Sequence, residues 1–331
     1  MKVCVLGATG FIGGHIARAS MDAGWTVRAV RRTVNNSGAI SDVPVEWVTA
    51  NLADVDSLRR AMAGCDVVFH AAAAYPQDFH HIEREVALAR SEMDNVLQAA
   101  RTAHVSRLLY TSSVTTIGLP PAGRIADERD VYRSGMVHSA YFEAKFAMER
   151  LALRESRNPD TIILLPTAVF GPGDIKPTTG VVIREAARGR IRAYFDATIN
   201  AVDVRDVAKA HVAAVERGQR AERYILGGTN LSVQRLLEEV CSLASVPPPQ
   251  LKISRTMLAW FVKIADHLPL VRLPENFRTF QTWQPVSSQK AQTELGLAPT
   301  DLSITLRDTI EWFRQRTRNP KETQAMGRPT T

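Results

Sequence analysis

Three side chains in the middle of this 331-residue chain have the types and spacing of an acid–base centre. Tyr141 and Lys145 are four positions apart, so a helix would present both on one face. A nearby ammonium lowers the pKa of a tyrosine, which can then exchange a proton with a carbonyl or an alcohol near neutral pH. Ser113 ends an expected strand and can hydrogen-bond the same oxygen. The set predicts carbonyl–alcohol chemistry.

A glycine-rich loop near the N-terminus predicts a dinucleotide site. The run Gly7-Ala-Thr-Gly10-Phe-Ile-Gly13 follows a short apolar stretch and opens a helical one. Its glycines allow a tight turn, close approach of the backbone to a pyrophosphate, and packing of helix on strand. The helix N-terminus adds free N–H groups and partial positive charge. The expected cofactor contacts in this loop are Gly7, Thr9, Gly10, Phe11, Ile12 and Gly13.

The end of the second expected strand indicates which nicotinamide cofactor is bound. NAD sites usually carry an acidic residue there for the ribose hydroxyls, whereas this chain has Arg31 and Arg32. Arginine can pair with a 2′-phosphate or stack on adenine, so the sequence favours NADP(H) and leaves NAD(H) possible. Further cofactor contacts are expected at the ends of later strands and at the catalytic positions: Asn51, Leu52, Ala71, Ala72, Ala73, Thr111, Tyr141 and Lys145.

Alternating strands and helices must position these groups. Strands are expected at 3–6, 27–30, 45–48, 67–70, 107–111 and 161–165, and helices near 11–23, 55–63, 82–103 and 139–156. The alternation predicts an α/β fold with a Rossmann-type, doubly wound parallel sheet. We expect a dinucleotide-binding domain over 1–165 plus 200–228, and a smaller, mostly helical substrate lobe over 166–199 and 229–316. A disordered tail is expected over 317–331.

Composition argues against several other classes of protein. The net charge of +7 comes from dispersed basic residues without a nucleic-acid motif, so no nucleic-acid partner is expected. Three single cysteines and the absence of an HExxH motif argue against disulfides and a metal site. No signal peptide is apparent, and no stretch reaches the roughly 18 apolar residues of a membrane span. We expect a cytoplasmic enzyme, with residues 257–265 as an amphipathic helix.

These motifs together resemble the extended short-chain dehydrogenase/reductase family, also called the NAD-dependent epimerase/dehydratase superfamily. Within it the chain is similar to the dihydroflavonol-reductase and sugar-epimerase groups, including the hopanoid-associated epimerases. The resemblance covers about residues 1–316 and includes Leu165-Pro-Thr-Ala-Val-Phe-Gly171-Pro172 and Val202-Asp-Val-Arg-Asp206. It implies that Ser113, Tyr141 and Lys145 are the catalytic set. It also implies nicotinamide contacts from Pro166, Thr167 and Val169, and a homodimer formed through the helices near 82–103 and 139–156.

Two departures from the family bear on the substrate. Sugar-nucleotide epimerases usually keep an arginine where this chain has Ile199, although Arg188, Arg190 or Arg192 could substitute. Sugar dehydratases carry an Asp-Glu pair where this chain has Ser112-Ser113, which argues against dehydration. The candidate substrate contacts are Tyr75, Ser113, Val114, His138 and Lys176, while Trp283 is expected to be a packing residue.

Three functions are consistent with this sequence. The first is a reductase in which Tyr141 protonates the oxygen of a ketone or aldehyde, Ser113 orients that oxygen and Lys145 tunes the tyrosine. The second is a nucleotide-sugar epimerase that keeps its cofactor bound through oxidation and re-reduction. The third is a dinucleotide sensor without catalysis, against which the intact Ser/Tyr/Lys set argues. The reductase is the favoured interpretation.

Overall fold

The computed structural model describes residues 1–34, 36–72, 81–254, 256–258, 260 and 282–318. Its centre is a seven-stranded sheet in the order β10-β6-β5-β4-β1-β2-β3, and every pairing is parallel. The strands are β1 (Lys2–Leu6), β2 (Thr26–Arg31), β3 (Glu46–Thr49), β4 (Val67–His70), β5 (Arg107–Thr111), β6 (Asp160–Pro166) and β10 (Arg223–Leu226). The predicted Rossmann-type α/β fold is confirmed.

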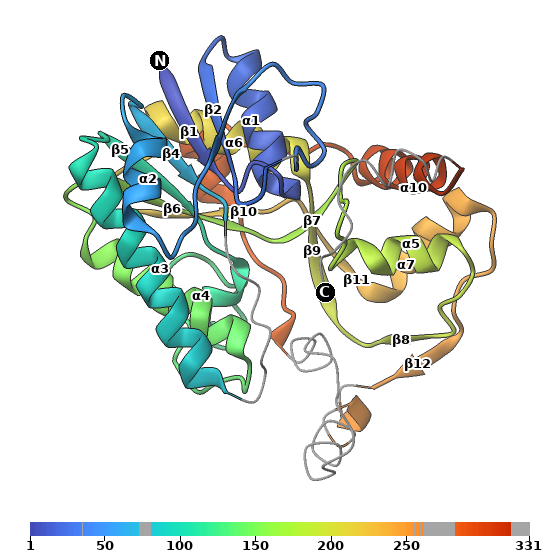
Figure 1. Ribbon diagram of the computed structural model, residues 1–331. Coiled ribbons are helices and arrows are strands. Elements are labelled where there is room, and N and C mark those ends of the chain that lie inside the picture. The colour runs from blue at the N-terminus through green and yellow to red at the C-terminus, as the bar shows by residue number, and fades with distance from the viewer. Residues whose placement is uncertain (35, 73–80, 255, 259, 261–281, 319–331) are drawn as a thin grey trace.

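Helices cover both faces of this sheet (Figure 1). On one face lie α2 (Val55–Met62), α3 (Ile82–Thr102) and α4 (Ala140–Arg154), which bury Leu58, Leu97 and Met148 in a shared core. On the other lie α1 (Phe11–Asp22) and α6 (Val204–Arg217), with Ile16 and Val207 in a second core. Because both faces are covered, the strands are apolar along most of their length.

A smaller lobe is joined to the sheet through β7 (Ala168–Phe170) and β9 (Thr198–Asp203) (Figure 1). These strands form a three-stranded sheet with β11 (Thr229–Ser232), while β8 (Ala193–Phe195) pairs with β12 (Leu251–Ile253). Helices α5 (Gly180–Ala187), α7 (Val233–Ala244) and α10 (Leu302–Arg318) pack around them. The lobe therefore contains two small sheets besides its helices. Two further short helical segments in the described part of the chain lie at Val114–Thr116 and Ala291–Leu295.

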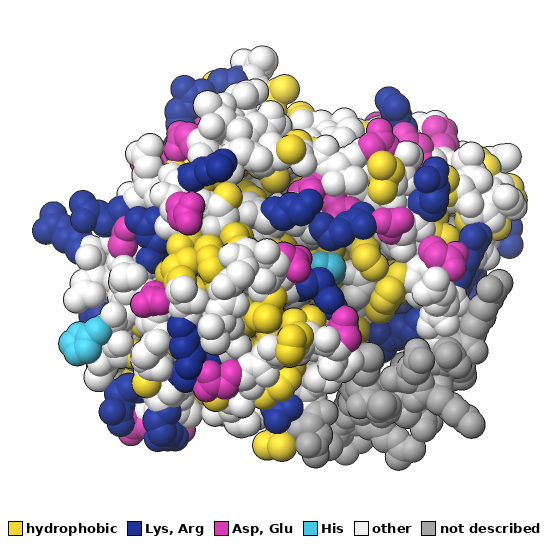
Figure 2. Space-filling view, turned by 90° about the horizontal axis from the view of Figure 1, so that it is seen from above, with side chains coloured by type: hydrophobic (Ala, Val, Ile, Leu, Met, Phe, Trp, Pro, Cys, Tyr) yellow, Lys and Arg dark blue, Asp and Glu magenta, His cyan; other side chains and the backbone are white. Residues whose placement is uncertain are grey.

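Several expectations fall on residues outside the described part of the chain. These are Ala73 and Tyr75, most of the segment 257–265, and the tail from 319 onward. Helix α10 itself continues through Thr317 to Arg318. None of the described helices combines the length and apolar character that a bilayer crossing requires. On the face shown in Figure 2, Lys and Arg side chains are scattered among Asp and Glu rather than gathered in a stripe.

Candidate active site

The glycine loop between β1 and α1 fits closely against the end of β4. Gly7 has a φ of +84°, and a Cβ there would lie 2.7 Å from the backbone nitrogen of Ala72. A Cβ on Gly13 would lie 2.2 Å from the Gly7 carbonyl oxygen. Only glycine fits either position. The first turn of α1 contains no acidic residue, and its N-cap, Gly10, offers no side chain, so the helix N-terminus suits an anion.

Helix α1 is also tied to the turn that follows β7. His15 Nε2 donates to the carbonyl oxygen of Pro172 at 2.8 Å. Burial lowers the pKa of His15, so its ring is neutral near pH 7. This bond joins the turn at Gly171–Gly173 to the helix that the glycine loop opens.

The end of β2 presents two arginines. The Arg31 guanidinium lies 5.2 Å from the centroid of the Trp47 ring, and its buried Nε has no hydrogen-bond partner. Arg32 is exposed. Neither guanidinium forms a hydrogen bond or an ion pair with the described residues, so both are available to a ligand. The adjoining turn is fixed by Asn51 Oδ1, which accepts from Ala53 N at 3.1 Å, and by Leu52 O, which accepts from Asn95 Nδ2 at 2.9 Å.

Lys145 lies on α4 against the end of β5. Its Nζ donates to the carbonyl oxygen of Thr111 at 3.0 Å and lies 5.2 Å from the Tyr110 ring centroid. Burial lowers the pKa of Lys145 to about 8, and the charge of Glu149 opposes this shift. The amine therefore carries its positive charge at neutral pH and loses it only slightly above.

Thr111 is fixed from the opposite face of the sheet as well. His211 Nδ1 donates to the Val207 carbonyl at 2.8 Å, so His211 Nε2 must accept from Thr111 Oγ1 at 2.9 Å. Burial lowers the pKa of His211 to about 4, which keeps this tautomer neutral. The end of β5 is thereby clamped between α4 and α6.

Ser113 and Tyr141 meet at a cavity of about 210 Å³. Ser113 caps the short helix Val114–Thr116, where its Oγ accepts from Thr115 N at 3.2 Å. Tyr141 lies in the first turn of α4, which Ser139 caps by accepting from Phe142 N. Serine hydroxyl, phenol and ammonium are thus carried by adjoining elements, and they can orient a substrate oxygen and give it a proton.

Several segments of the chain enclose the cavity, and two groups of lining residues are named here. We call the lining residues between Ser113 and Leu119 and between Tyr132 and Phe142 the catalytic wall. We call the lining residues Thr167, Ala168 and those on β9 the lobe wall. The described lining residues contain no charged side chain. They are Ser113, Val114, Thr115, Ile117, Gly118, Leu119, Tyr132, Met136, Val137, Tyr141, Phe142, Thr167, Ala168, Thr178, Thr179, Thr198, Ile199, Asn200, Thr282, Trp283, Gln284 and Val286.

Comparison with known proteins identifies the family. The model described as the NAD dependent epimerase/dehydratase family matches residues 3–227. The chain belongs to this family. A protein named as a dihydroflavonol 4-reductase from Synechocystis is 34% identical over 324 residues, covering 93% of each chain. Sterol demethylase protein B from Methylococcus capsulatus is 29% identical over 330 residues, covering 96% of this chain and 99% of its own.

A solved structure agrees with the sequence relatives. A nucleoside-diphosphate-sugar epimerase from Pseudomonas aeruginosa is 30% identical and has a TM-score of 0.83, with coverage of 96% of this chain and 98% of its own. This epimerase/dehydratase family member is therefore an NAD(P)-dependent enzyme of the extended short-chain dehydrogenase/reductase type. The resemblance drawn from the sequence is confirmed.

Some of the predicted substrate and nicotinamide contacts of this family member line the cavity, and others do not. Ser113 and Val114 line the cavity, as does Thr167 from the predicted nicotinamide contacts. Pro166 ends β6 and Val169 lies in β7, next to Thr167. His138 and Lys176 are exposed and do not line the cavity. Arg188 and Arg190 pair with Glu185, and Arg192 is exposed. None of these three arginines is among the described residues that line the cavity beside Ile199.

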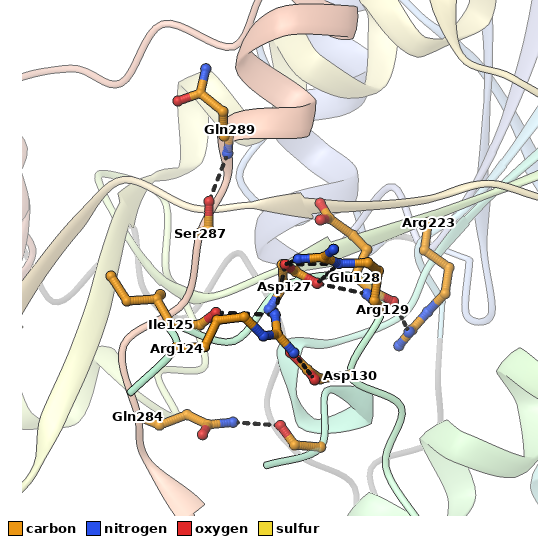
Figure 3. Close-up of polar contacts among 11 residues, drawn as sticks. Arg124, Ile125, Asp127, Glu128, Arg129, Asp130, Arg223, Gln284, Ser287 and Gln289 are labelled. Atoms are coloured by element: carbon orange, nitrogen blue, oxygen red, sulfur yellow. Dashed lines mark hydrogen bonds and ion pairs between the residues drawn. The ribbon is translucent and has the colours of Figure 1, made fainter. Parts of the chain in front are cut away.

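Sequence reasoning missed part of the cavity lining. Asn200, Tyr132 and Gln284 line the cavity and come from three separate segments. Trp283 was expected to be a packing residue, but it also lines the cavity. Gln284 Nε2 donates to the Gly118 carbonyl at 2.8 Å (Figure 3) and so joins the segment before residue 286 to the catalytic wall. Among the described residues, no group of three His, Cys, Asp or Glu side chains could hold a metal ion.

Proposed function

We propose that this enzyme reduces a neutral ketone or aldehyde with NADPH. The observation that carries the proposal is the uncharged cavity beside Ser113 and Tyr141. A bound nicotinamide cofactor would supply the hydride. Ser113 orients the carbonyl oxygen, and Tyr141 donates a proton to it as the alcohol forms. Lys145 favours the phenolate that remains, and would hold the nicotinamide ribose.

The absence of charge in the described lining argues against a nucleotide-sugar substrate. A diphosphate needs a cationic partner when it leaves water. Ile199 occupies the position of the family's arginine, is 5% exposed and lines the cavity. The names of the Synechocystis protein and of the cinnamoyl-CoA reductases, one of which is 31% identical over 253 residues, support reduction as the type of reaction.

The preference for NADPH over NADH rests on the end of β2. Arg31 and Arg32 provide two cations that form no ion pair with the described residues, although the charge of Arg32 acts to lower the pKa of Glu92, and the carboxylate typical of NAD sites is missing there. A 2′-phosphate would satisfy the buried Arg31 Nε. NAD(H) remains a possible second cofactor.

Two further properties belong to the proposal. A homodimer formed through α3 and α4 is proposed from the family resemblance, and these two helices pack together on one face of the sheet. A reduced, cytoplasmic location is supported by the three free cysteines, all of which are buried.

The test begins with the purified wild-type protein. Any nucleotide that copurifies is released by denaturation and identified by mass, and a panel of neutral ketones and aldehydes is then assayed for NADPH consumption. Stoichiometric consumption with formation of the alcohol would support the reductase. Interconversion of nucleotide sugars without net NADPH loss would replace it with an epimerase, and cofactor binding without any turnover would indicate a sensor.

A further inference from the structure

A buried carboxylate lies two helical turns beyond Tyr141. Glu149 follows Lys145 by four positions on α4, so Tyr141, Lys145 and Glu149 share one helix face. Glu149 is only 3% exposed. Its Oε2 accepts from Ser112 Oγ at 2.6 Å and from Thr116 Oγ1 at 2.7 Å, and its Oε1 lies 2.7 Å from Arg223 Nε.

Three side chains of α4 each lie at a different residue of the segment that ends β5 and follows it. Lys145 bonds the main chain of Thr111, Glu149 bonds the side chain of Ser112, and Tyr141 shares the cavity with Ser113. Thr116 Oγ1 also lies 2.9 Å from the carbonyl oxygen of Ser113. Glu149 therefore contacts the residue before Ser113 and the residue three after it, and fixes the turn between them.

Arg223 supplies the counter-charge from β10. Its guanidinium donates to the Thr116 carbonyl at 2.9 Å and to the Glu128 carbonyl at 2.7 Å, the latter shown in Figure 3. Arg223 is 8% exposed, so this is a buried ion pair with additional hydrogen bonds. Such pairs add little net stability compared with apolar packing. A role at the neighbouring catalytic groups gives this pair a purpose that stability alone does not.

Among the groups around Lys145, Glu149 is the one whose charge raises the pKa of the lysine. Burial lowers the pKa of His70, at the end of β4, to about 3, so this ring is neutral beside Lys145. His211 on α6 is likewise neutral. Tyr110 on β5 contacts the Lys145 ammonium through the face of its ring. Tyr141 is the phenol whose pKa Lys145 is proposed to lower. Arg223 lies beyond Glu149 and is neutralised by it. The carboxylate is therefore the charge that favours the ammonium form of Lys145.

We propose that Glu149 is a positioning residue for the reduction: its carboxylate holds the turn that carries Ser113, and its negative charge keeps Lys145 protonated. The inference rests on the proposed roles of Ser113, Tyr141 and Lys145. It assigns two separable functions to one side chain, orientation and charge. Two substitutions at the same position can separate them.

The experiment compares Glu149→Gln, which removes the charge, with Glu149→Asp, which keeps the charge and shortens the reach. Both are assayed as full-length protein with NADPH and a neutral carbonyl substrate from about pH 6 to about pH 10, a range that spans the titration of Lys145. We expect kcat to fall about 10–100-fold in both variants, with a smaller change in KM. The basic limb of the kcat profile should move about one pH unit lower in Glu149→Gln and stay in place in Glu149→Asp.

Glu155→Gln is the matched control. Glu155 ends the same helix, where it pairs with Arg101 and Arg154 at the surface. This variant should keep the wild-type kcat and pH profile. Equal effects of Glu149→Gln and Glu155→Gln would overturn the proposal, as would a well-folded Glu149→Gln whose basic limb does not move. If Glu149→Gln does not fold, Glu149→Asp still decides the orienting role, because an unchanged kcat there would refute it.

A second readout keeps this inference separate from the proposed reduction. The titration of Lys145 is followed by NMR of lysine-labelled protein, with Lys145→Arg used to assign the signal. The midpoint should fall by about one pH unit in Glu149→Gln relative to wild type. Failure of the wild-type protein to reduce any carbonyl would refute the proposed function alone. An unchanged Lys145 midpoint in Glu149→Gln would refute the charge role of Glu149, whatever the substrate.

Discussion

Behind the catalytic wall lie the buried charges of Lys145, Glu149 and Arg223, whereas the described residues through which the lobe wall lines the cavity are uncharged. On the lobe wall, Asn200 Oδ1 accepts from Gly228 N and from Thr167 Oγ1, each at 2.9 Å. Asn200 Nδ2 donates to Asn230 Oδ1 at 2.9 Å. These groups satisfy one another and leave the cavity neutral.

The difference follows from what each wall must do. Proton transfer needs an ammonium and its counter-charge close to the phenol, and their separation from water makes them effective. Binding of a neutral substrate needs shape and a few hydrogen bonds, and a charge on that side would lose hydration without gaining a partner. In the proposed mechanism, the two walls thus divide reactivity and selectivity between two parts of the chain.

Removing the acid from the catalytic wall should give the largest effect. In Tyr141→Phe, kcat/KM for carbonyl reduction should fall by about 10²–10⁴, because the phenol is the proposed proton donor. Affinity for NADPH, measured by its fluorescence on binding, should change little. Tyr194→Phe is the control, since Tyr194 lies in the core of the lobe and outside the cavity lining. Retained turnover in Tyr141→Phe would remove the catalytic assignment.

A charged side chain on the lobe wall should weaken binding of a neutral substrate, because the wall would no longer be uncharged. Ile199→Arg puts an unpartnered guanidinium into the neutral cavity, so kcat/KM for a neutral carbonyl substrate should fall by roughly 100-fold, mainly through KM. Ile304→Arg, a change at an exposed position of α10, should have no such effect. A nucleotide sugar that binds the wild-type enzyme as well as it binds Ile199→Arg would show that the missing arginine does not decide the substrate.

The catalytic wall could be predicted from the sequence because its signals are local. The Tyr141–Lys145 spacing lies within one helix, and Ser113 follows a strand that was predicted at the residues where β5 lies. Glu149 was missed, although an acidic residue four positions beyond Lys145, on the same helix face, is a signal that could have revealed it.

The lobe wall gave no comparable signal. Strand β7 contains three residues, too few for a periodic pattern, and β9 pairs with β7 and β11 from distant parts of the chain. Asn200 and Gln284 reach the cavity only through this tertiary arrangement. Long-range pairing, rather than local propensity, therefore decides the substrate side of the enzyme.

A third test concerns the cofactor end of the catalytic half. Arg32→Ala should weaken NADPH binding about tenfold or more and NADH binding much less, because the lost cation would pair with a 2′-phosphate. Dissociation constants for both cofactors, measured by fluorescence titration, provide the check. Arg59→Ala is the matched control, since Arg59 is an exposed arginine that pairs with Asp56 on α2. Equal losses for NADPH and NADH in Arg32→Ala would argue against the preference for NADP.

The smallest effect is expected where the segment before residue 286 meets the catalytic wall. Gln284→Ala removes the bond from Gln284 Nε2 to the Gly118 carbonyl, which is worth about 1 kcal/mol. We expect KM for the carbonyl substrate to rise a few-fold with kcat nearly unchanged, because the lost bond shapes the cavity and takes no part in the proposed proton transfer. Gln289→Ala, which alters an exposed glutamine that bonds Thr293, should leave both constants unchanged. If kcat of Gln284→Ala fell as far as kcat of Tyr141→Phe, this contact would affect the chemical step. The proposed division between reactivity and selectivity would then be wrong.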